Sequence, residues 1–129
     1  MTIYYNRYGW QNLIFLSGVK EVWKKFKSKG IARIEKLVGE YNIWELNKSP
    51  YGKFKIKIFE NSDNIYSGYT NIHIADELGD FYCAVGYGKS EEEALENTIA
   101  EFYKMTERKE KWEEADFQCI ICKRMPSKE

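Results

Sequence analysis

The stretch Ala84–Thr106, AVGYGKSEEEALENTIAEFYKMT, decides the fold of this chain. Ser90 stands three residues before Glu93. This is the spacing of a capping box, in which the serine hydroxyl accepts the Glu93 amide and the Glu93 carboxylate accepts the Ser90 amide. Apolar residues then recur at helical spacing, with small residues beside them: Leu95, Ile99, Phe102, Met105, and Ala94, Thr98, Thr106. The stretch predicts an amphipathic helix that begins after Ser90 and extends to about Trp112.

A strand is expected directly before this helix. Phe81–Val85 is an apolar run of residues that favour strands, and Gly86 and Gly88 allow a sharp turn between the strand and the helix. A strand that leads so directly into a helix implies that the helix packs back across the sheet.

Further strands are predicted on both sides of this unit. In the clearest of them, Lys53–Phe59, large apolar residues alternate with lysines. Gly68 marks a candidate bulge in a longer strand. The other strand patterns lie at residues 41–46, 65–75 and 117–122.

An earlier helix is also expected. Helical spacing of apolar residues starts after Ser17, with a lysine-rich opposite face. Gly30 is a candidate helix stop, but the spacing continues to Val38, so a kink at Gly30 is the alternative. The order of elements predicts the α+β class, with an antiparallel sheet of about four to six strands and helices packed on one face.

Length and composition favour one cytoplasmic domain. The 129 residues suffice for a single domain, 1–129, with an aromatic segment and a basic amphipathic helix in 1–40 and the sheet and main helix in 41–125. Lys plus Arg equals Asp plus Glu at 20 each, which argues against a protein dominated by non-specific nucleic-acid binding. We expect no signal peptide, because the first sixteen residues are tyrosine-rich and contain no sustained apolar core, and no apolar run is long enough to span a membrane. Three cysteines, an odd number, predict reduced thiols.

Gly86–Ser90, GYGKS, resembles part of a phosphate-binding loop. The full pattern requires a further glycine at the position of Cys83. The three glutamates that follow Ser90 would also repel an anion. A structural turn is therefore the preferred interpretation.

Cys119 and Cys122 have a CxxC spacing and could form a zinc site with Cys83 and His73. The two residues between them are isoleucines, which indicates a buried strand, and residues three apart on a strand point to opposite faces. We therefore expect buried free thiols, no metal and no cofactor. His73, the single histidine, has no nucleophile at a distinctive spacing, so we expect no enzymatic activity.

Gly88–Asn97, GKSEEEALEN, resembles the turn and helix start of HicB-type antitoxins, in which a small residue and a Ser or Thr precede an E-E-A-L-x-N run. The expected order over Lys53–Met125, three strands, a helix and a strand, is similar to the partial RNase-H-like domain of that family. The resemblance implies a non-enzymatic domain that binds a toxin. No segment like that family's C-terminal DNA-binding part follows, so autoregulation is not implied.

The same turn is similar to one in double-stranded-RNA-binding domains, through two glycines, Ser90 and Ala94. In that family lysines begin the helix, whereas Glu91 and Glu92 stand here. The replacement reverses the charge that RNA binding requires.

The sequence thus favours a non-enzymatic protein that blocks a host or cognate partner protein, of the antitoxin, immunity or phage anti-defence type. The alternatives are a small-ligand binder, such as a nucleotide-sequestering sponge, and an RNA-binding module that uses the lysine-rich helix. An exposed edge strand would allow a homodimer. Tyrosines could stack on a base, basic residues could bind its phosphates, and the N-terminal aromatics could contact a partner. The candidate binding residues are Tyr66, Tyr69, Tyr82, Tyr87, Lys89, Lys53, Arg108, Tyr4, Tyr5, Tyr8 and Trp10.

Overall fold

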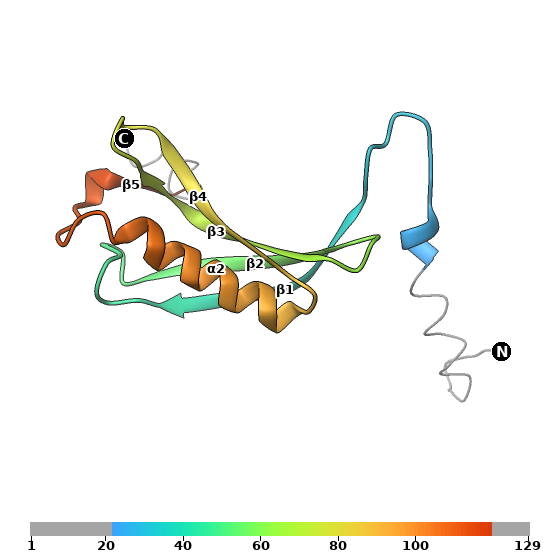
Figure 1. Ribbon diagram of the computed structural model, residues 1–129, viewed down its shortest axis with the longest axis horizontal. Coiled ribbons are helices and arrows are strands. Elements are labelled where there is room, and N and C mark those ends of the chain that lie inside the picture. Colours follow the sequence, from blue (N-terminus) through green and yellow to red (C-terminus); the bar gives the residue numbers. More distant parts are fainter. Residues whose placement is uncertain (1–21, 120–129) are drawn as a thin grey trace, which may run out of the picture. The chain divides into compact units, whose positions relative to one another are not determined.

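The structure is a computed structural model that describes residues 22–119 (Figure 1). The described residues separate by their contacts into two compact units. Unit 1 contains residues 22–35 and Asn61–Asp63, and unit 2 contains Lys36–Glu60 and residues 64–119. The predicted contact residues Tyr4, Tyr5, Tyr8 and Trp10, and Cys122, lie outside the described part of the chain.

Unit 2 is built on an antiparallel sheet with one helix packed against it, which confirms the α+β class (Figure 1). The strands follow one another across the sheet in the order β1-β2-β3-β4, and β5 pairs with β3. The described part of the chain has one α-helix, α2 (Glu91–Thr106), and it is too short to cross a membrane. The strands are β1 (Glu35–Trp44), β2 (Lys53–Asn61), β3 (Tyr66–Ala75), β4 (Phe81–Gly88) and β5 (Phe117–Cys119).

Strand β3 pairs with three other strands. Its first half pairs with β2, from Glu60↔Tyr66 to Ile56↔Thr70. Beyond Thr70, the edge of β3 that faced β2 pairs with β5 instead. The opposite edge of β3 pairs with β4. Where β2 leaves β3, the Lys55 N–H donates to the Asn71 side-chain oxygen over 2.8 Å. The sheet therefore opens after Thr70, and β5 fills the opening.

A bulge in β3 lies between Tyr69 and His73, where the register with β4 shifts. The Thr70 hydroxyl accepts the Ala84 N–H of β4 over 3.0 Å and donates to the Ile72 carbonyl over 2.8 Å. The side chain thus takes the hydrogen bond that the shifted backbone cannot make. The predicted bulge at Gly68 is wrong, because Gly68 pairs in regular register with Gly86.

The core lies between α2 and one face of the sheet. The predicted alternation in β2 is confirmed, because Phe54, Ile56 and Ile58 are buried while the lysines between them are not. The Phe54 and Phe102 rings pack with their centroids 4.6 Å apart. The buried hydrophobic residues are Phe54, Ile56, Ile58, Ile72, Ile74, Ala84, Ala94, Phe102 and Phe117.

Helix α2 packs closely on glycines of β3 and β4. Gly86 and Gly88 lie within β4, so the predicted glycine turn before the helix is wrong. A Cβ at Gly86 would lie 2.5 Å from the Asn97 carbonyl carbon and 2.7 Å from Thr98 Cα, so the helix backbone rests directly on this strand. Such an approach requires small side chains on the helix.

The buried face of α2 is consequently rotated from the predicted one. Its fully buried residues recur at steps of four, whereas Leu95, Ile99 and Met105 are only partly buried. Because the helix lies so close to the glycines, only small side chains such as those of Ala94 and Thr98 fit between helix and sheet there. The larger Leu95, Ile99 and Met105 lie at the sides of this interface. The buried residues are Ala94, Thr98, Phe102 and Thr106.

The ends of α2 differ in part from the prediction. The Ser90 hydroxyl accepts the Glu93 N–H over 3.1 Å, as expected, but the Glu93 carboxylate accepts the N–H of Lys89, over 2.8 Å, instead of that of Ser90. The helix ends at Thr106, earlier than predicted. The Trp112 indole N–H donates to the Thr106 carbonyl over 2.9 Å. Trp112 was predicted to be near the last helical residue, but its side chain instead caps the end of the helix at Thr106.

Replacing Ser90 by alanine should lower the free energy of unfolding by about 1 kcal/mol, because the Glu93 N–H loses its acceptor. The matched variant Ser90→Asp keeps an accepting oxygen and should lose much less. Urea denaturation followed by circular dichroism measures both. Equal stability of Ser90→Ala and the wild type would show that the cap contributes nothing.

The helix predicted up to Val38 is wrong within the described residues. Unit 1 has only a short 3-10 helix, η1 (Val22–Lys25), followed by a turn in which Gly30 has φ +90°. The Ile31 N–H closes this turn on the Ser28 carbonyl. η1 ends at Lys25, and the chain then turns at Gly30 in a left-handed conformation. The residues that follow the turn form β1 from Glu35.

Candidate functional site

The sheet face opposite α2 gathers lysines and aromatic rings. Side chains alternate along a strand, so the residues between the buried isoleucines of β2 point away from the helix. Tyr69 faces the same way, because its partner on β2 is Lys57. None of the side chains that define this face is buried. We call it the lysine–aromatic face: Trp44, Lys53, Lys55, Lys57, Phe59, Tyr69 and Tyr87.

Contacts among these residues hold the face in a defined shape. The Lys53 ammonium lies over the Trp44 ring, 4.7 Å from its centroid. The Phe59 and Tyr69 rings meet edge to face at 5.9 Å. The Lys55 ammonium forms an ion pair with Glu40 at 3.2 Å. Lys55, Lys57, Phe59 and Tyr69 also border a shallow hollow of about 330 Å³.

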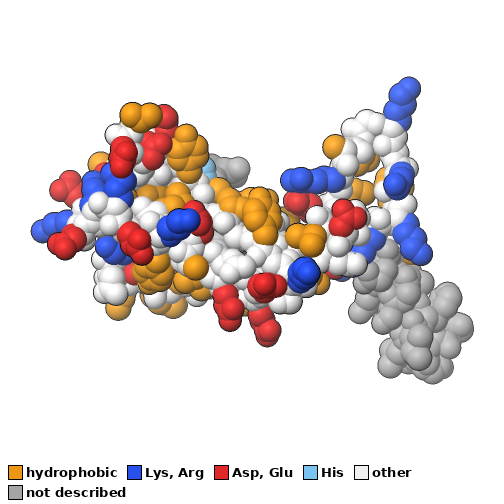
Figure 2. All heavy atoms as spheres, viewed as in Figure 1, with side chains coloured by type: hydrophobic (Ala, Val, Ile, Leu, Met, Phe, Trp, Pro, Cys, Tyr) orange, Lys and Arg blue, Asp and Glu red, His pale blue; other side chains and the backbone are white. Residues whose placement is uncertain are grey.

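Charge is segregated in unit 2 although the whole chain is neutral. Acidic side chains gather where α2 begins (Figure 2), at Glu91, Glu92 and Glu93. The Tyr41 hydroxyl donates to the Glu91 carboxylate, and this hydrogen bond raises the pKa of Tyr41. Because the carboxylates of Glu91 and Glu93 already accept protein donors at this helix start, the site does not suit an anion.

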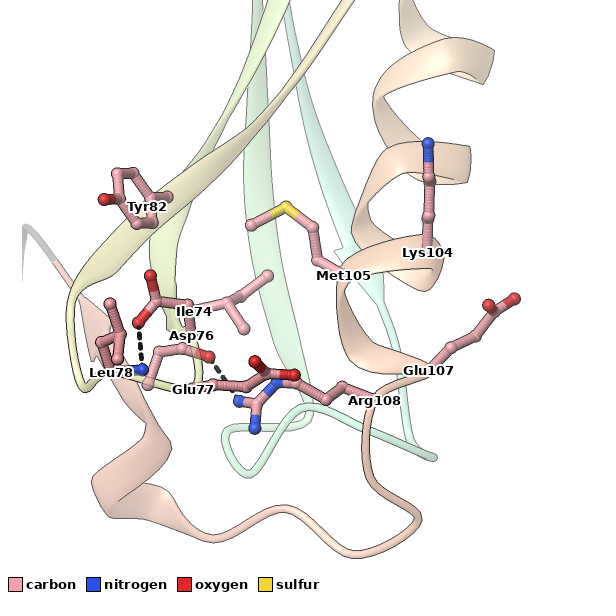
Figure 3. A pocket seen from close by; sticks show the side chains of 10 residues that line it. Ile74, Asp76, Glu77, Leu78, Tyr82, Lys104, Met105, Glu107 and Arg108 are labelled. Atoms are coloured by element: carbon pink, nitrogen blue, oxygen red, sulfur yellow. Dashed lines mark hydrogen bonds between the residues drawn. The ribbon is translucent and has the colours of Figure 1, made fainter.

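A cleft of about 660 Å³ lies between the β3–β4 turn and the end of α2 (Figure 3). Ile74 and Met105 point toward each other in it, and Tyr82 forms the wall on β4, while Lys104 and Glu107 point away. The Arg108 guanidinium donates to the Ala75 carbonyl over 2.6 Å.

Two polar side chains of this cleft, those of Asp76 and Arg108, hold parts of the fold together. The Asp76 carboxylate accepts the N–H groups of Leu78 and Asp80, each over 2.9 Å, and so closes the β3–β4 turn. The Arg108 guanidinium also lies 4.9 Å from the centroid of the Trp112 ring. Asp76 and Arg108 thus both have structural roles at the border of this cleft.

The predicted binding residues do not form one site. Tyr69, Tyr87 and Lys53 share the lysine–aromatic face, whereas Tyr82 and Arg108 line the cleft. Tyr66 packs against the core, and Lys89 precedes the first turn of α2. Because side chains alternate along a strand, Tyr66 and Tyr82 lie on the sheet face that carries the helix, whereas Tyr69 and Tyr87 lie on the opposite face.

The residues of the suggested zinc site also point apart. His73 and Cys83 are cross-strand partners and share a face, but Cys119 pairs with Ile72 and faces the other way. Within residues 22–119 no three His, Cys, Asp or Glu side chains are grouped to hold a metal ion. Burial raises the pKa of the Cys83 thiol.

Glu45 is a buried carboxylate that sequence reasoning missed. It accepts the backbone N–H groups of Asn47, Lys48 and Ser49 over 3.1, 2.8 and 2.7 Å, and the Tyr103 hydroxyl of α2 over 3.0 Å. Burial alone would raise the pKa of Glu45, but these hydrogen bonds outweigh it and hold the pKa below its ordinary value. The carboxylate thus fixes the loop after β1 to the helix and has a structural role.

Unit 1 has a basic surface of its own. Trp23, Phe26 and Ile31 line a hollow of about 490 Å³ together with lysines of the same segment and Arg33. Arg33 forms an ion pair with Glu35 at 3.4 Å.

No protein-family model matches this chain, and comparisons with curated proteins and with solved structures find no match either. The resemblance to HicB-type antitoxins therefore stays a prediction.

Proposed function

We propose that this chain is a non-enzymatic binding protein that acts in the cytoplasm, as a homodimer, and blocks a host or cognate partner protein of the kind that antitoxins, immunity proteins or phage anti-defence proteins bind. The lysine–aromatic face supports this proposal. It presents Trp44, 71% exposed, and Tyr87, 61% exposed, on the sheet. Tryptophan and tyrosine are enriched in protein interfaces, where large rings provide contact area at a low entropic cost.

The charge of this face indicates the chemistry of the partner. Three lysines lie on it and one of them is paired with Glu40, so the face keeps a net positive charge. An acidic surface is complementary to such a face and would be attracted to it. We therefore propose a partner with an acidic surface that has recesses for aromatic rings.

Reversing two charges on this face should abolish capture of the partner. Lys53→Glu/Lys57→Glu should lose a protein that the wild-type chain captures from its native host after chemical cross-linking, because like charges would then oppose each other. The matched variant Lys104→Glu/Lys111→Glu has the same charge change on other exposed positions and should keep the capture. Capture by the wild type should weaken as salt rises.

Two outcomes would contradict this proposal. One is equal capture by the two double variants, provided that circular dichroism shows both folded. The other is the absence of any protein that depends on Lys53 and Lys57.

A second candidate function is binding of single-stranded RNA or a nucleotide on the same face. Exposed aromatic rings interleaved with lysines on a sheet are also the means by which proteins stack bases and hold phosphates. Fluorescence anisotropy with a labelled single-stranded RNA tests it. Binding that falls steeply with salt and is lost in Lys53→Glu/Lys57→Glu would favour RNA. A thermal shift with nucleotides and no binding of RNA would favour the nucleotide sponge.

A further inference from the structure

We infer that two copies of this chain pair through the free edge of β4, antiparallel, with Cys83 of one protomer opposite Cys83 of the other. Among the described strands β4 pairs only with β3, and it forms one border of the sheet while β1 forms the other (Figure 1). An edge strand presents a row of backbone donors and acceptors to which another strand can pair.

The backbone of β4 directs these groups outward at Phe81, Cys83 and Val85. The Ala84 N–H points toward β3, where it donates to the Thr70 hydroxyl. Backbone groups alternate in direction along an antiparallel strand, so the N–H and C=O groups of the neighbouring residues point away from β3.

Helix α2 covers the far end of this edge. The Asn97 side-chain amide donates to the Tyr87 carbonyl over 2.6 Å. The open part of the edge is therefore Phe81–Val85.

The open segment has none of the features that usually prevent pairing. FYCAV contains no charged residue and no proline, and both protect edge strands. At the opposite border, β1 contains Glu35, Lys36 and Glu40. Of the two borders, β4 is thus the one left open to association.

The sequence of the segment is complementary to itself. In an antiparallel pair centred on Cys83, Phe81 lies opposite Val85 of the second copy, an aromatic–β-branched pair of the kind that stabilises sheets. On the other face Tyr82, 53% exposed, lies opposite the small Ala84. A two-fold axis repeats both contacts. This self-complementarity favours a second copy of the chain over an unrelated strand.

Sedimentation velocity on the full chain tests the dimer. Cys83→Lys would place two lysines opposite each other and should raise the dimer dissociation constant by about fivefold or more. The matched variant Tyr87→Lys adds the same charge to the same strand at the end that Asn97 covers, and should remain a dimer. A wild type that stays monomeric at tens of micromolar overturns the inference, as does a folded Cys83→Lys protein that dimerises like the wild type.

Disulfide cross-linking provides a second measurement that does not depend on a charged variant. Opposite residues of an antiparallel hydrogen-bonded pair have Cα atoms about 5.5 Å apart, within the range of a disulfide. Cys119→Ser/Cys122→Ser leaves Cys83 as the only thiol and should form a reducible dimer on mild oxidation. The further change Cys83→Ser should abolish that dimer. Failure of the Cys83-only protein to cross-link would contradict this register.

Discussion

Gly86→Ala should destabilise this protein by about 3 kcal/mol or more, enough to unfold a marginally stable domain. The added methyl would lie 2.5 Å from the Asn97 carbonyl carbon and 2.7 Å from Thr98 Cα. Both atoms belong to the backbone of α2, so no rotamer change can relieve the clash. The helix would have to move off the sheet and would expose part of the core beneath it.

Gly39→Ala provides the matched control, because the same substitution is made in a strand of the same sheet. There the added methyl meets the end of the Glu91 side chain and the Tyr41 ring. Side chains can shift, so we expect a loss of less than about 1 kcal/mol. Thermal and urea denaturation followed by circular dichroism compare the two variants. Equal losses would contradict close backbone contact as the basis of helix docking.

Glu45→Ala should cost about 3 kcal/mol, because one buried carboxylate serves four donors. Ser49 is buried, so its N–H would be left without an acceptor. Tyr103→Phe removes only one of these hydrogen bonds and should cost about 1 kcal/mol. Urea denaturation gives both values. A loss in Glu45→Ala no larger than that in Tyr103→Phe would contradict this role of the carboxylate.

The contribution of Glu45 should also depend on pH in a defined direction. Its pKa in the folded protein lies below the ordinary value of 4.5, so the unfolded chain binds the proton more readily. The stabilisation is therefore complete above the ordinary pKa and is lost as the pH falls through the folded-state pKa.

Glu45→Gln isolates this effect, because the amide cannot titrate. The stability difference between the wild type and Glu45→Gln should be largest near neutral pH and should shrink below about pH 4. Glu96→Gln makes the same substitution at an exposed position of α2 and serves as the surface control. A Glu45→Gln difference that is constant from pH 7 to pH 3 would contradict the lowered pKa.

The sequence predicted correctly those elements whose conformation depends on neighbouring residues in the chain. The alternation in Lys53–Phe59 identified both the strand and its buried face, and Ser90 identified the start of α2. The helical spacing of apolar residues on both sides of Gly30 favoured a kinked helix over a stop at Gly30, but η1 ends at Lys25 and the residues from Glu35 join a sheet. The strand conformation of this segment depends on its pairing with β2. That pairing partner is distant in the sequence, so the local pattern of residues does not reveal it.

The candidate site was predictable only in part for the same reason. The lysines of β2 were expected on one face, but the position of Trp44 beside Lys53 depends on how β1 meets β2. The tyrosines looked like one set in the sequence, whereas strand register sends Tyr69 and Tyr82 to opposite faces. Glu45 gave no signal, because its donors come from backbone groups of a loop and from a helix far along the chain.

The pairing of β5 with β3 beyond Thr70 affects the order in which the strands can pair during synthesis. β3 can pair with β2 and β4 early, but the opening beyond Thr70 stays unfilled until Phe117–Cys119 has left the ribosome. Contacts between residues so far apart in the chain form slowly. Until these contacts form, the edge of β3 at Ile72–Ile74 has unpaired backbone groups, which promote aggregation of a nascent chain. A chaperone that shields this opening would therefore act on the late nascent chain, after the hairpins have formed and before the last strand arrives.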